Sequence, residues 1–307
     1  MWTLLAFISA LCLGFYDISK KIALRDNRVV DVLTLSVCFS SFVLSIPLIL
    51  SRLYPELMLG TPFYVPRLDM TAHLYTILKS VIVLSSWIFA YISLKHLPLS
   101  VVSPLQATRP MWTLVGALLI FHEQLNTWQW TGVLLAIGTI FLFSLGATKT
   151  AHHPALFKEH KFYYLCLALA ILIGSCSGLY DKYLMRRYDH NAVQVYYTFY
   201  QAIMMLIMWV VIRVKESKSV SFRPLAQRSL LPIVLISLFL IVSDNVYMLA
   251  LRDPDSLIAV VSTIRRGGAI IGFAYGLLLL KEPDPLRKII CMAGILAGLI
   301  CLALGSI

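Results

Sequence analysis

Long apolar runs alternate with short polar segments along almost the whole chain. Ten of these runs come close to the about 20 residues that a helix needs to cross the hydrocarbon core of a bilayer. The pattern therefore predicts an all-α membrane protein with ten transmembrane helices. Their approximate limits are 2–21, 30–51, 72–95, 98–121, 127–146, 162–183, 192–212, 229–251, 256–280 and 286–306.

The composition agrees with this pattern. Hydrophobic residues make up 59% of the chain and charged residues 13%, and the mean hydropathy is +0.82, which excludes a soluble globular protein. The polar segment Lys149–Lys161 contains His152, His153 and His160, but no cysteine or acidic ligand set accompanies them. We interpret this segment as a solvated connector, and we expect neither a metal site nor a cofactor.

An internal repeat divides the chain into two halves. Residues 100–123 reappear without a gap at 259–282, an offset of 159, and Gly14–Asp17 reappears at Gly178–Asp181 with an offset of 164. The repeat predicts a first five-helix unit over 1–148, a linker over 149–161 and a second five-helix unit over 162–307. Because five is odd, the second unit enters from the other side, and the repeat is expected to be inverted. The site of such a protein is expected between the halves, near the middle of the bilayer.

Lysine and arginine residues are divided unevenly between the two sides of the predicted membrane. With alternating runs, 16 lie in or beside loops on one side and 6 on the other, while Lys79, Arg109, Arg265 and Arg266 lie inside runs. The positive-inside rule predicts that the richer side is cytoplasmic, so that both termini lie outside a cell (inner) membrane. The same rule explains the net charge of +11 without a nucleic-acid partner.

Several loose motifs point to a known family. Glu123 ends one run and Trp130-Thr131-Gly132 opens the next, Leu279-Leu280-Lys281-Glu282 holds the equivalent place in the second half, and Lys20 ends the first run. In this respect the chain resembles the EamA-type ten-helix proteins of the drug/metabolite transporter superfamily. The resemblance implies a secondary transporter with a central cavity lined by helices 1, 3, 4, 6, 8 and 9. It also implies cytoplasmic termini, so the orientation stays open between the resemblance and the charge count.

Arginines lie deep in the fourth and ninth runs. An ionisable side chain at this depth costs at least about 2.5–3.5 kcal/mol unless it is paired or faces a cavity. Arg109 and either Arg265 or Arg266 are expected to present guanidinium groups from opposite walls of one cavity, beside Gln106. Neighbouring residues point about 100° apart on a helix, so one of the paired arginines is expected to be structural. The alternative is that Asp244 neutralises one of them, which is compatible with substrate contact by the other.

Carboxylates and lysines occupy further deep positions. Asp17 and Asp181 hold equivalent places in the repeat, and Lys20 follows Asp17 by three residues, a spacing that allows a local ion pair. Two interpretations remain for Asp17, Asp181, Lys20 and Lys79: coupling of transport to an ion, or ion pairs at helix ends. The deep cations Lys20, Lys79, Arg109, Arg265 and Arg266 outnumber the deep carboxylates Asp17, Asp181 and Asp244 by 5 − 3 = 2. This surplus favours a substrate that carries a carboxylate or a phosphate.

Aromatic side chains inside the runs are candidates for the lining of the same cavity. They are Trp87, Trp112, Tyr16, Tyr180 and Tyr200. Each is alternatively a packing residue or an anchor at the membrane interface.

The predicted function is secondary transport of a small metabolite, such as an amino acid or organic acid, by alternating access. No phosphate-binding G-x-x-x-x-G-K-[ST] motif, H-E-x-x-H motif or G-x-S-x-G elbow occurs, so the chain is not expected to be an enzyme. The alternatives are an integral-membrane enzyme and a non-transporting scaffold. The expected partners are the small-molecule substrate and the lipid bilayer. The protein is expected to be a monomer or a homodimer, the latter through the small-residue face Gly294-x-x-x-Gly298.

Overall fold

The computed structural model of the chain describes residues 1–24, 27–96, 108–147, 161–216, 230–268, 270–271 and 285–305. Within these residues the secondary structure is entirely helical, with eleven helices. The first half contains α1 (Trp2–Leu24), α2 (Val29–Leu53), α3 (Pro55–Met58), α4 (Met70–His96), α6 (Arg109–Ile120) and α7 (Thr127–Ala147). The second half contains α9 (Lys161–Met185), α10 (His190–Glu216), α11 (Leu230–Arg252), α12 (Ile258–Arg266) and α14 (Pro285–Leu304).

Six of these helices, α1, α2, α4, α9, α10 and α11, are long and apolar enough to cross a membrane, which makes the chain a multi-pass membrane protein. Helix α6 and the Met292–Leu304 part of α14 are apolar but shorter. Each described helix except α3 lies within or close to a predicted run. Lys161, predicted as the last linker residue, is instead the first residue of α9, and the rest of the linker, 149–160, lies outside the described residues.

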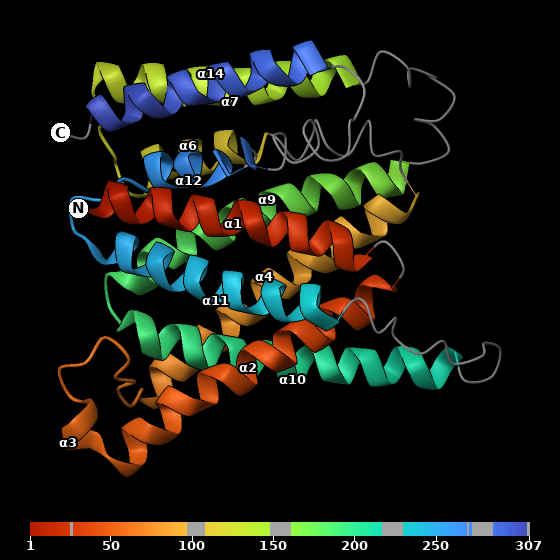
Figure 1. The fold of residues 1–307 in the computed structure, drawn as a ribbon, viewed down its shortest axis with the longest axis vertical. Coiled ribbons are helices and arrows are strands. Elements are labelled where there is room, and N and C mark those ends of the chain that lie inside the picture. Colours follow the sequence, from red (N-terminus) through yellow and green to blue (C-terminus); the bar gives the residue numbers. More distant parts are fainter. Residues whose placement is uncertain are drawn as a thin grey trace.

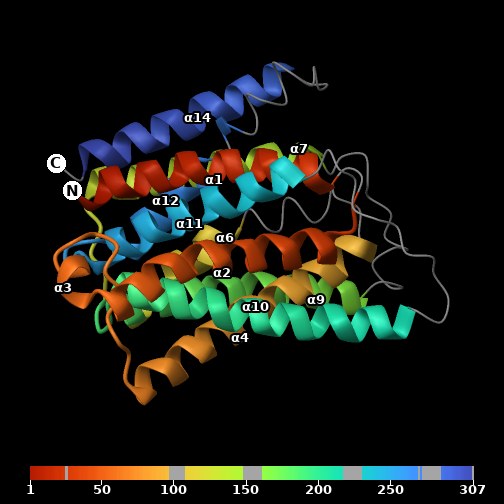
Figure 2. The same ribbon diagram turned by 60° about the horizontal axis from the view of Figure 1, so that its bottom comes forward.

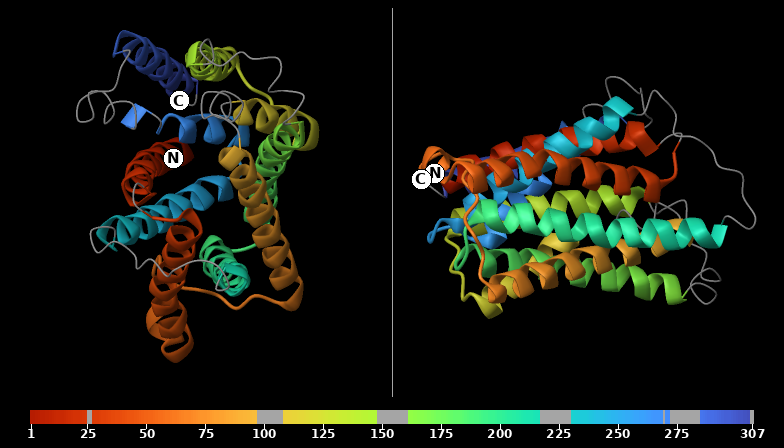
Figure 3. Two further views of the ribbon diagram at one scale, coloured as in Figure 1. Left: turned by 90° about the vertical axis from the view of Figure 1, so that its right-hand side faces the viewer. Right: turned by 90° about the horizontal axis from the view of Figure 1, so that it is seen from below.

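The helices stack in five layers, each with one helix from either half (Figure 1). From the top of that view the layers are α7 with α14, α6 with α12, α1 with α9, α4 with α11, and α2 with α10. The most extensive contacts join α1 to α11, α7 to α14 and α4 to α9. Both chain termini and α3 lie at the same end of the bundle, which we call the termini face (Figures 2 and 3).

The predicted fourth and ninth helices are described only in part, and their described parts stop at nearly equivalent repeat positions. Helix α6 begins at Arg109, with Pro110 buried in its first turn, where a proline's missing N–H costs nothing. Helix α12 ends at Arg266, and Gly267 follows as its C-cap. Pro110 and the Gly267-Gly268 pair therefore lie at the ends of the described helices α6 and α12. Gln106 and Leu279–Glu282 lie outside the described residues.

The small-residue face of α14 is covered within the chain. A Cβ added at Gly294 would lie 2.5 Å from the Thr139 side chain, and one at Gly298 would lie 2.9 Å from Ala136 Cβ, both on α7. Gly132 of α7 meets the Gly298 carbonyl oxygen in return, at 2.7 Å from an added Cβ. This face therefore packs against α7 within the chain.

Candidate functional site

A buried ion pair joins the two halves near the middle of the bundle. Lys79 of α4 donates a hydrogen bond to Asp181 of α9. The Lys79 side chain is 3% exposed, and its ammonium lies 4.5 Å from the centre of the Tyr197 ring on α10. Both charges predicted at these positions are therefore neutralised by each other, and an aromatic face covers the cation.

A second ion pair lies within the second half. Arg265 of α12 donates from Nη2 to Asp244 Oδ1 on α11 at 2.9 Å, and its guanidinium carbon lies 3.9 Å from the centre of the Tyr247 ring. The pairing predicted between Asp244 and an arginine of the ninth helix is therefore present. Arg265 is therefore engaged within the second half by Asp244 and Tyr247.

Arg109 and Arg266 differ from these two pairs. In the described part of the chain neither guanidinium forms an ion pair with a carboxylate. The two groups lie close enough for Arg266 to be the charge that acts most strongly on Arg109, and Asp17 is the carboxylate that acts most strongly on Arg266. Two like charges from opposite halves thus lie in one region, and in the described residues Asp17 acts on Arg266 without forming an ion pair with it, an arrangement that suits an anion.

The charged end of α1 faces the interior of the bundle. Leu4, Ile8 and Leu11 are exposed along one face of α1, and helical geometry places Asp17 roughly 150° away from that face. Asp17 is nevertheless exposed, so its carboxylate borders accessible space on the inner side of the helix. The Lys20 ammonium lies one turn further, 5.6 Å from the centre of the buried Tyr16 ring.

A small polar cavity borders Asp244. It is lined by Val37, Ser40, Gln194, Tyr197, Thr198, Gln201, Leu240, Ile241 and Asp244, from α2, α10 and α11. Two buried lining atoms, Ser40 Oγ and Gln201 Nε2, have no hydrogen-bond partner in the described structure. Buried polar atoms are normally satisfied, so this cavity suits a small polar occupant.

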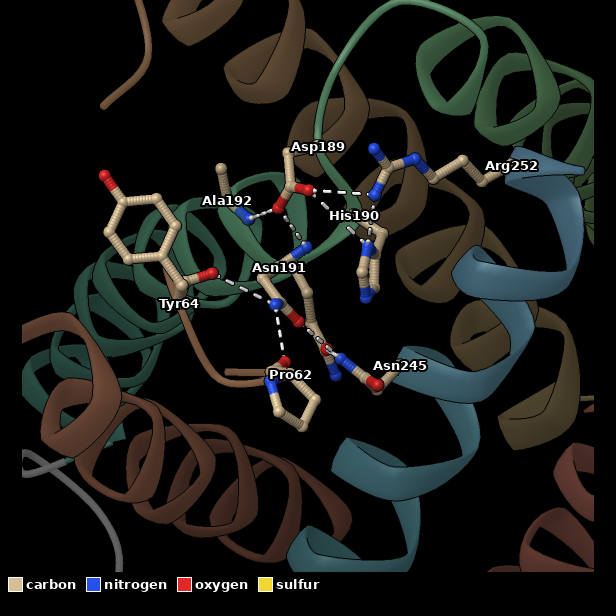
Figure 4. Close-up of polar contacts among 9 residues, drawn as sticks. Pro62, Tyr64, Asp189, His190, Asn191, Ala192, Asn245 and Arg252 are labelled. Carbon is tan, nitrogen blue, oxygen red and sulfur yellow. Dashed lines mark hydrogen bonds and ion pairs between the residues drawn. The ribbon is translucent and has the colours of Figure 1, made fainter. Parts of the chain in front are cut away.

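Polar contacts close the termini face between the halves (Figure 4). Asn191 of α10 donates to the carbonyl oxygens of Pro62 (2.8 Å) and Tyr64 (3.1 Å) in the α3–α4 loop. Asn245 of α11 donates to Asn191 Oδ1 at 2.9 Å, which ties the same loop to a third element. In the two Asn191 contacts the loop contributes backbone carbonyl oxygens, so this closure, which we call the backbone lock, depends on the path of the loop main chain.

An exposed ion pair flanks this lock. Arg252 at the end of α11 donates to Asp189 Oδ2 at 3.1 Å (Figure 4). Burial acts to raise the pKa of Asp189, but the hydrogen bond and charge of His190, with help from the Ala192 N–H and Arg252, hold that pKa below its usual value.

Glu123 and Lys182 fasten the α12 end of the same face. Glu123 accepts hydrogen bonds from the backbone N–H groups of Ile258 (2.6 Å) and Ala259 (3.1 Å), so a residue of the first half caps a helix of the second. Burial raises the Glu123 pKa above its usual value, against the effect of these two bonds. Lys182, counted above among the loop charges, is instead fully buried and donates to Ser256.

The predicted aromatic residues lie in different surroundings. Trp87 is half-buried in α4, and Trp112 is 48% exposed on the same face of α6 as Met111 and Val115. Tyr180 donates to the Tyr75 carbonyl oxygen at 3.1 Å, and Tyr200 shares a 2.8 Å hydrogen bond with His73 near the termini face. Tyr16 lies beside a predicted charge, the Lys20 ammonium.

Two residues of the central region escaped the sequence analysis. Tyr247 stacks on Arg265, and its position one turn after Asp244 was the available signal. Gly174 of α9 lies against the Arg109 guanidinium, and nothing in its local sequence indicated this contact.

Comparison with known proteins agrees with this architecture. No curated protein shows a significant match to the chain. A solved structure, described only as the crystal structure of a protein, is similar with a TM-score of 0.76 and 14% sequence identity, over 99% of this chain and 96% of that chain. At this identity the likeness shows the fold alone. Residues 1–145 match the sequence profile of the EamA-like transporter family. This match over residues 1–145 agrees with the family resemblance predicted from the sequence.

Proposed function

We propose that the chain is a secondary transporter of a small metabolite carrying a carboxylate or phosphate, and that it works by alternating access between two inverted five-helix halves. The membrane is taken to be the cell (inner) membrane, with the termini face outside, as the distribution of basic residues favours. The observation that carries the proposal is the pair of guanidinium groups of Arg109 and Arg266, one from each half, neither of which forms an ion pair with a carboxylate of the described residues.

The helix contacts support the inverted repeat. Exchanging the halves replaces α1 by α9, α4 by α11 and α6 by α12. The exchange turns the α1–α11 contact into α9–α4 and the α6–α9 contact into α12–α1, and all four contacts exist. The contacts α2–α10, α6–α12 and α7–α14 map onto themselves. Helix α1 begins at the termini face whereas α9 ends there, as an inverted relation requires (Figure 3).

The distribution of charge supports an anionic substrate. Lys79 and Arg265 are each matched by a carboxylate, so the surplus of positive charge falls on Arg109, Arg266 and Lys20, with Asp17 as the remaining anion. Guanidinium forks suit carboxylate and phosphate because they bind both oxygens at once. A bound anion would remove the repulsion between the two arginines.

The state of the two faces supports alternating access. The termini face is closed by contacts that cross the halves, from Asn191 to the α3–α4 loop and from Glu123 to α12. Asp17, in contrast, is accessible on the inner side of α1. In the proposed cycle this conformation is closed at the termini face, and release of those contacts opens it.

The test is uptake by the full-length protein in proteoliposomes, with amino acids, organic acids and sugar phosphates as the panel. We expect uptake of organic acids or sugar phosphates, and a reduction of kcat/KM by about tenfold or more in Arg109→Ala and in Arg266→Ala, the worth of a hydrogen bond to a charged group. Arg67→Ala, which removes a guanidinium from the α3–α4 loop, is the matched control and is expected to transport normally.

Normal uptake by both Arg109→Ala and Arg266→Ala would refute the arginine site. Uptake restricted to neutral or cationic solutes would refute the anionic substrate class while leaving transport itself intact.

A further inference from the structure

We infer that Gly174 is a positioning residue for substrate selection. Because it has no side chain, the Arg109 guanidinium packs directly on its backbone and is held in a fixed orientation for a planar oxyanion. This inference rests on the proposed function, since it concerns how the proposed anion site is built.

The contact between the two residues leaves no room for any other side chain. A Cβ added at Gly174 would lie 2.1 Å from Arg109 Nη2, 2.3 Å from Cζ and 2.7 Å from Nε. Real Cβ atoms do not approach other atoms so closely, so glycine alone permits the observed position. The clash involves only the far end of a flexible side chain, which can swing away. A substitution is therefore expected to displace the guanidinium without disrupting the helices.

The backbone of Arg109 cannot follow such a displacement. Ser175 Oγ, next to Gly174, donates to the Arg109 carbonyl oxygen at 3.1 Å and so fastens the start of α6 to α9. Thr113 Oγ1 donates to the same oxygen at 3.3 Å. Thr113 belongs to α6 itself, so the Ser175 bond is the contact that holds this part of the main chain against α9, and the guanidinium then rests on Gly174.

The related crossing in the other half shows that Gly174 is not needed for helix approach alone. The repeat offset of 159 pairs Arg109 with Gly268, and the offset of 164 pairs Gly174 with Ala10. In the structure Gly268 packs on Ala10, where an added Cβ would lie 2.4 Å from the Ala10 carbonyl oxygen. The small residue thus changes side between the two helix crossings. At the α1–α12 crossing Gly268 packs on the backbone of Ala10, and at the α6–α9 crossing the Arg109 side chain packs on Gly174.

This exchange explains why the two halves differ in chemistry at equivalent positions. At the α1–α12 crossing the two backbones are in contact. At the α6–α9 crossing the guanidinium of Arg109 lies between the helices, where Arg266 acts on its charge. A fixed guanidinium offers two parallel donors to a carboxylate or phosphate, whereas a mobile one acts only as a point charge. Displacement of a positioning group by about 1 Å can cost up to about a hundredfold in rate.

The experiment compares Gly174→Ala with Gly178→Ala in the purified full-length protein. Both glycines lie on α9, one turn apart, but a Cβ at Gly178 meets only the Tyr247 hydroxyl at 3.9 Å, an ordinary contact. Binding of inorganic phosphate and of citrate is measured by the rise in Tm on titration. We expect Gly174→Ala to weaken binding of the preferred anion by about tenfold or more, and Gly178→Ala to bind like the wild type. Without anion, the Tm of neither variant should fall.

A double-mutant cycle separates positioning from a general structural role. If Gly174 acts through Arg109, Gly174→Ala has no further effect on the Kd in an Arg109→Ala background. Equal binding by Gly174→Ala and Gly178→Ala, or additive losses in the cycle, would overturn the inference and leave the anion site standing. Failure of both anions to raise the Tm of the wild type, or wild-type binding by Arg109→Ala, would instead refute the proposed anion site itself.

Discussion

Two ion pairs hold the middle of the bundle, and their surroundings differ. Lys79 and Asp181 are 3% and 10% exposed and join the two halves, whereas Arg265 and Asp244 are 16% and 20% exposed and lie within one half. The first pair is the more deeply buried and lies under Tyr197, while Asp244 of the second pair lines a small cavity that Tyr197 also borders. The same pairing of charges can therefore act as a permanent connection in one place and as an exchangeable contact in the other.

Breaking the more deeply buried pair is expected to give the largest effect. Asp181→Asn leaves the Lys79 ammonium buried without a counter-charge, and such a loss costs about 3–5 kcal/mol of unfolding free energy. The measurement is thermal or denaturant unfolding of the purified protein in detergent.

The matched control removes both charges. The double variant Lys79→Met with Asp181→Leu is expected to recover most of the lost stability, because no charge then remains without a partner. A stability of Asp181→Asn equal to that of the wild type would show that Lys79 finds another partner, and the distinction between the two pairs would fall.

The partly accessible pair is expected to respond less in stability and more in function. Asp244→Asn should reduce the unfolding free energy by about 2 kcal/mol, because Arg265 and Asp244 are 16% and 20% exposed and so are less completely desolvated than Lys79 and Asp181. Released from Asp244, Arg265 adds a third free arginine near Arg109 and Arg266, so the Kd for inorganic phosphate should fall while uptake slows. Measurement of both quantities on one preparation tests this, and a loss of stability as large as that of Asp181→Asn would contradict it.

Much of this architecture was predictable from sequence because it depends on properties that repeat along the chain. Apolar runs located every described helix except the short α3. The Asp244 pairing was foreseen as one of two alternatives, since a buried guanidinium requires a counter-charge wherever one is within reach.

Contacts between distant helices set the limit of sequence inference. The pairing of Lys79 with Asp181 depends on which helices meet, and residue spacing carries no information on that point. The burial of Lys182 was missed for a similar reason: its partner Ser256 lies 74 residues away in a loop. Gly174 shows this limit most clearly. A glycine in an apolar helix can serve several purposes, and its contact with Arg109 becomes visible only when the positions of both helices are known.

A third ion pair extends the comparison to the end of the bundle opposite the termini face. Asp31 in the first turn of α2 accepts hydrogen bonds from Arg213 Nη2 at 2.9 Å and from Trp209 Nε1 at 2.7 Å. Asparagine keeps a carbonyl oxygen that can still accept these bonds, and the Arg213 side chain is 23% exposed, so Asp31→Asn should cost only about 1–2 kcal/mol of unfolding free energy. Unfolding under the conditions used for Asp181→Asn gives the comparison, and a larger loss than in Asp244→Asn would reverse the proposed order.

The exposed pair between Arg252 and Asp189 should give the smallest effect. Arg252 is 52% exposed and Asp189 25%, so Asp189→Asn is expected to cost less than about 1 kcal/mol at neutral pH. Its pH dependence is the more informative measurement. The pKa of Asp189 is lower in the folded protein than its ordinary value of 3.8, so the unfolded chain binds the proton more tightly. The stabilisation is therefore present above about pH 4 and is lost as the pH falls through the lower folded value. Asp189→Asn should remove this part of the acid dependence, and an unchanged profile between pH 5 and pH 2 would show that the carboxylate does not stabilise the closed termini face.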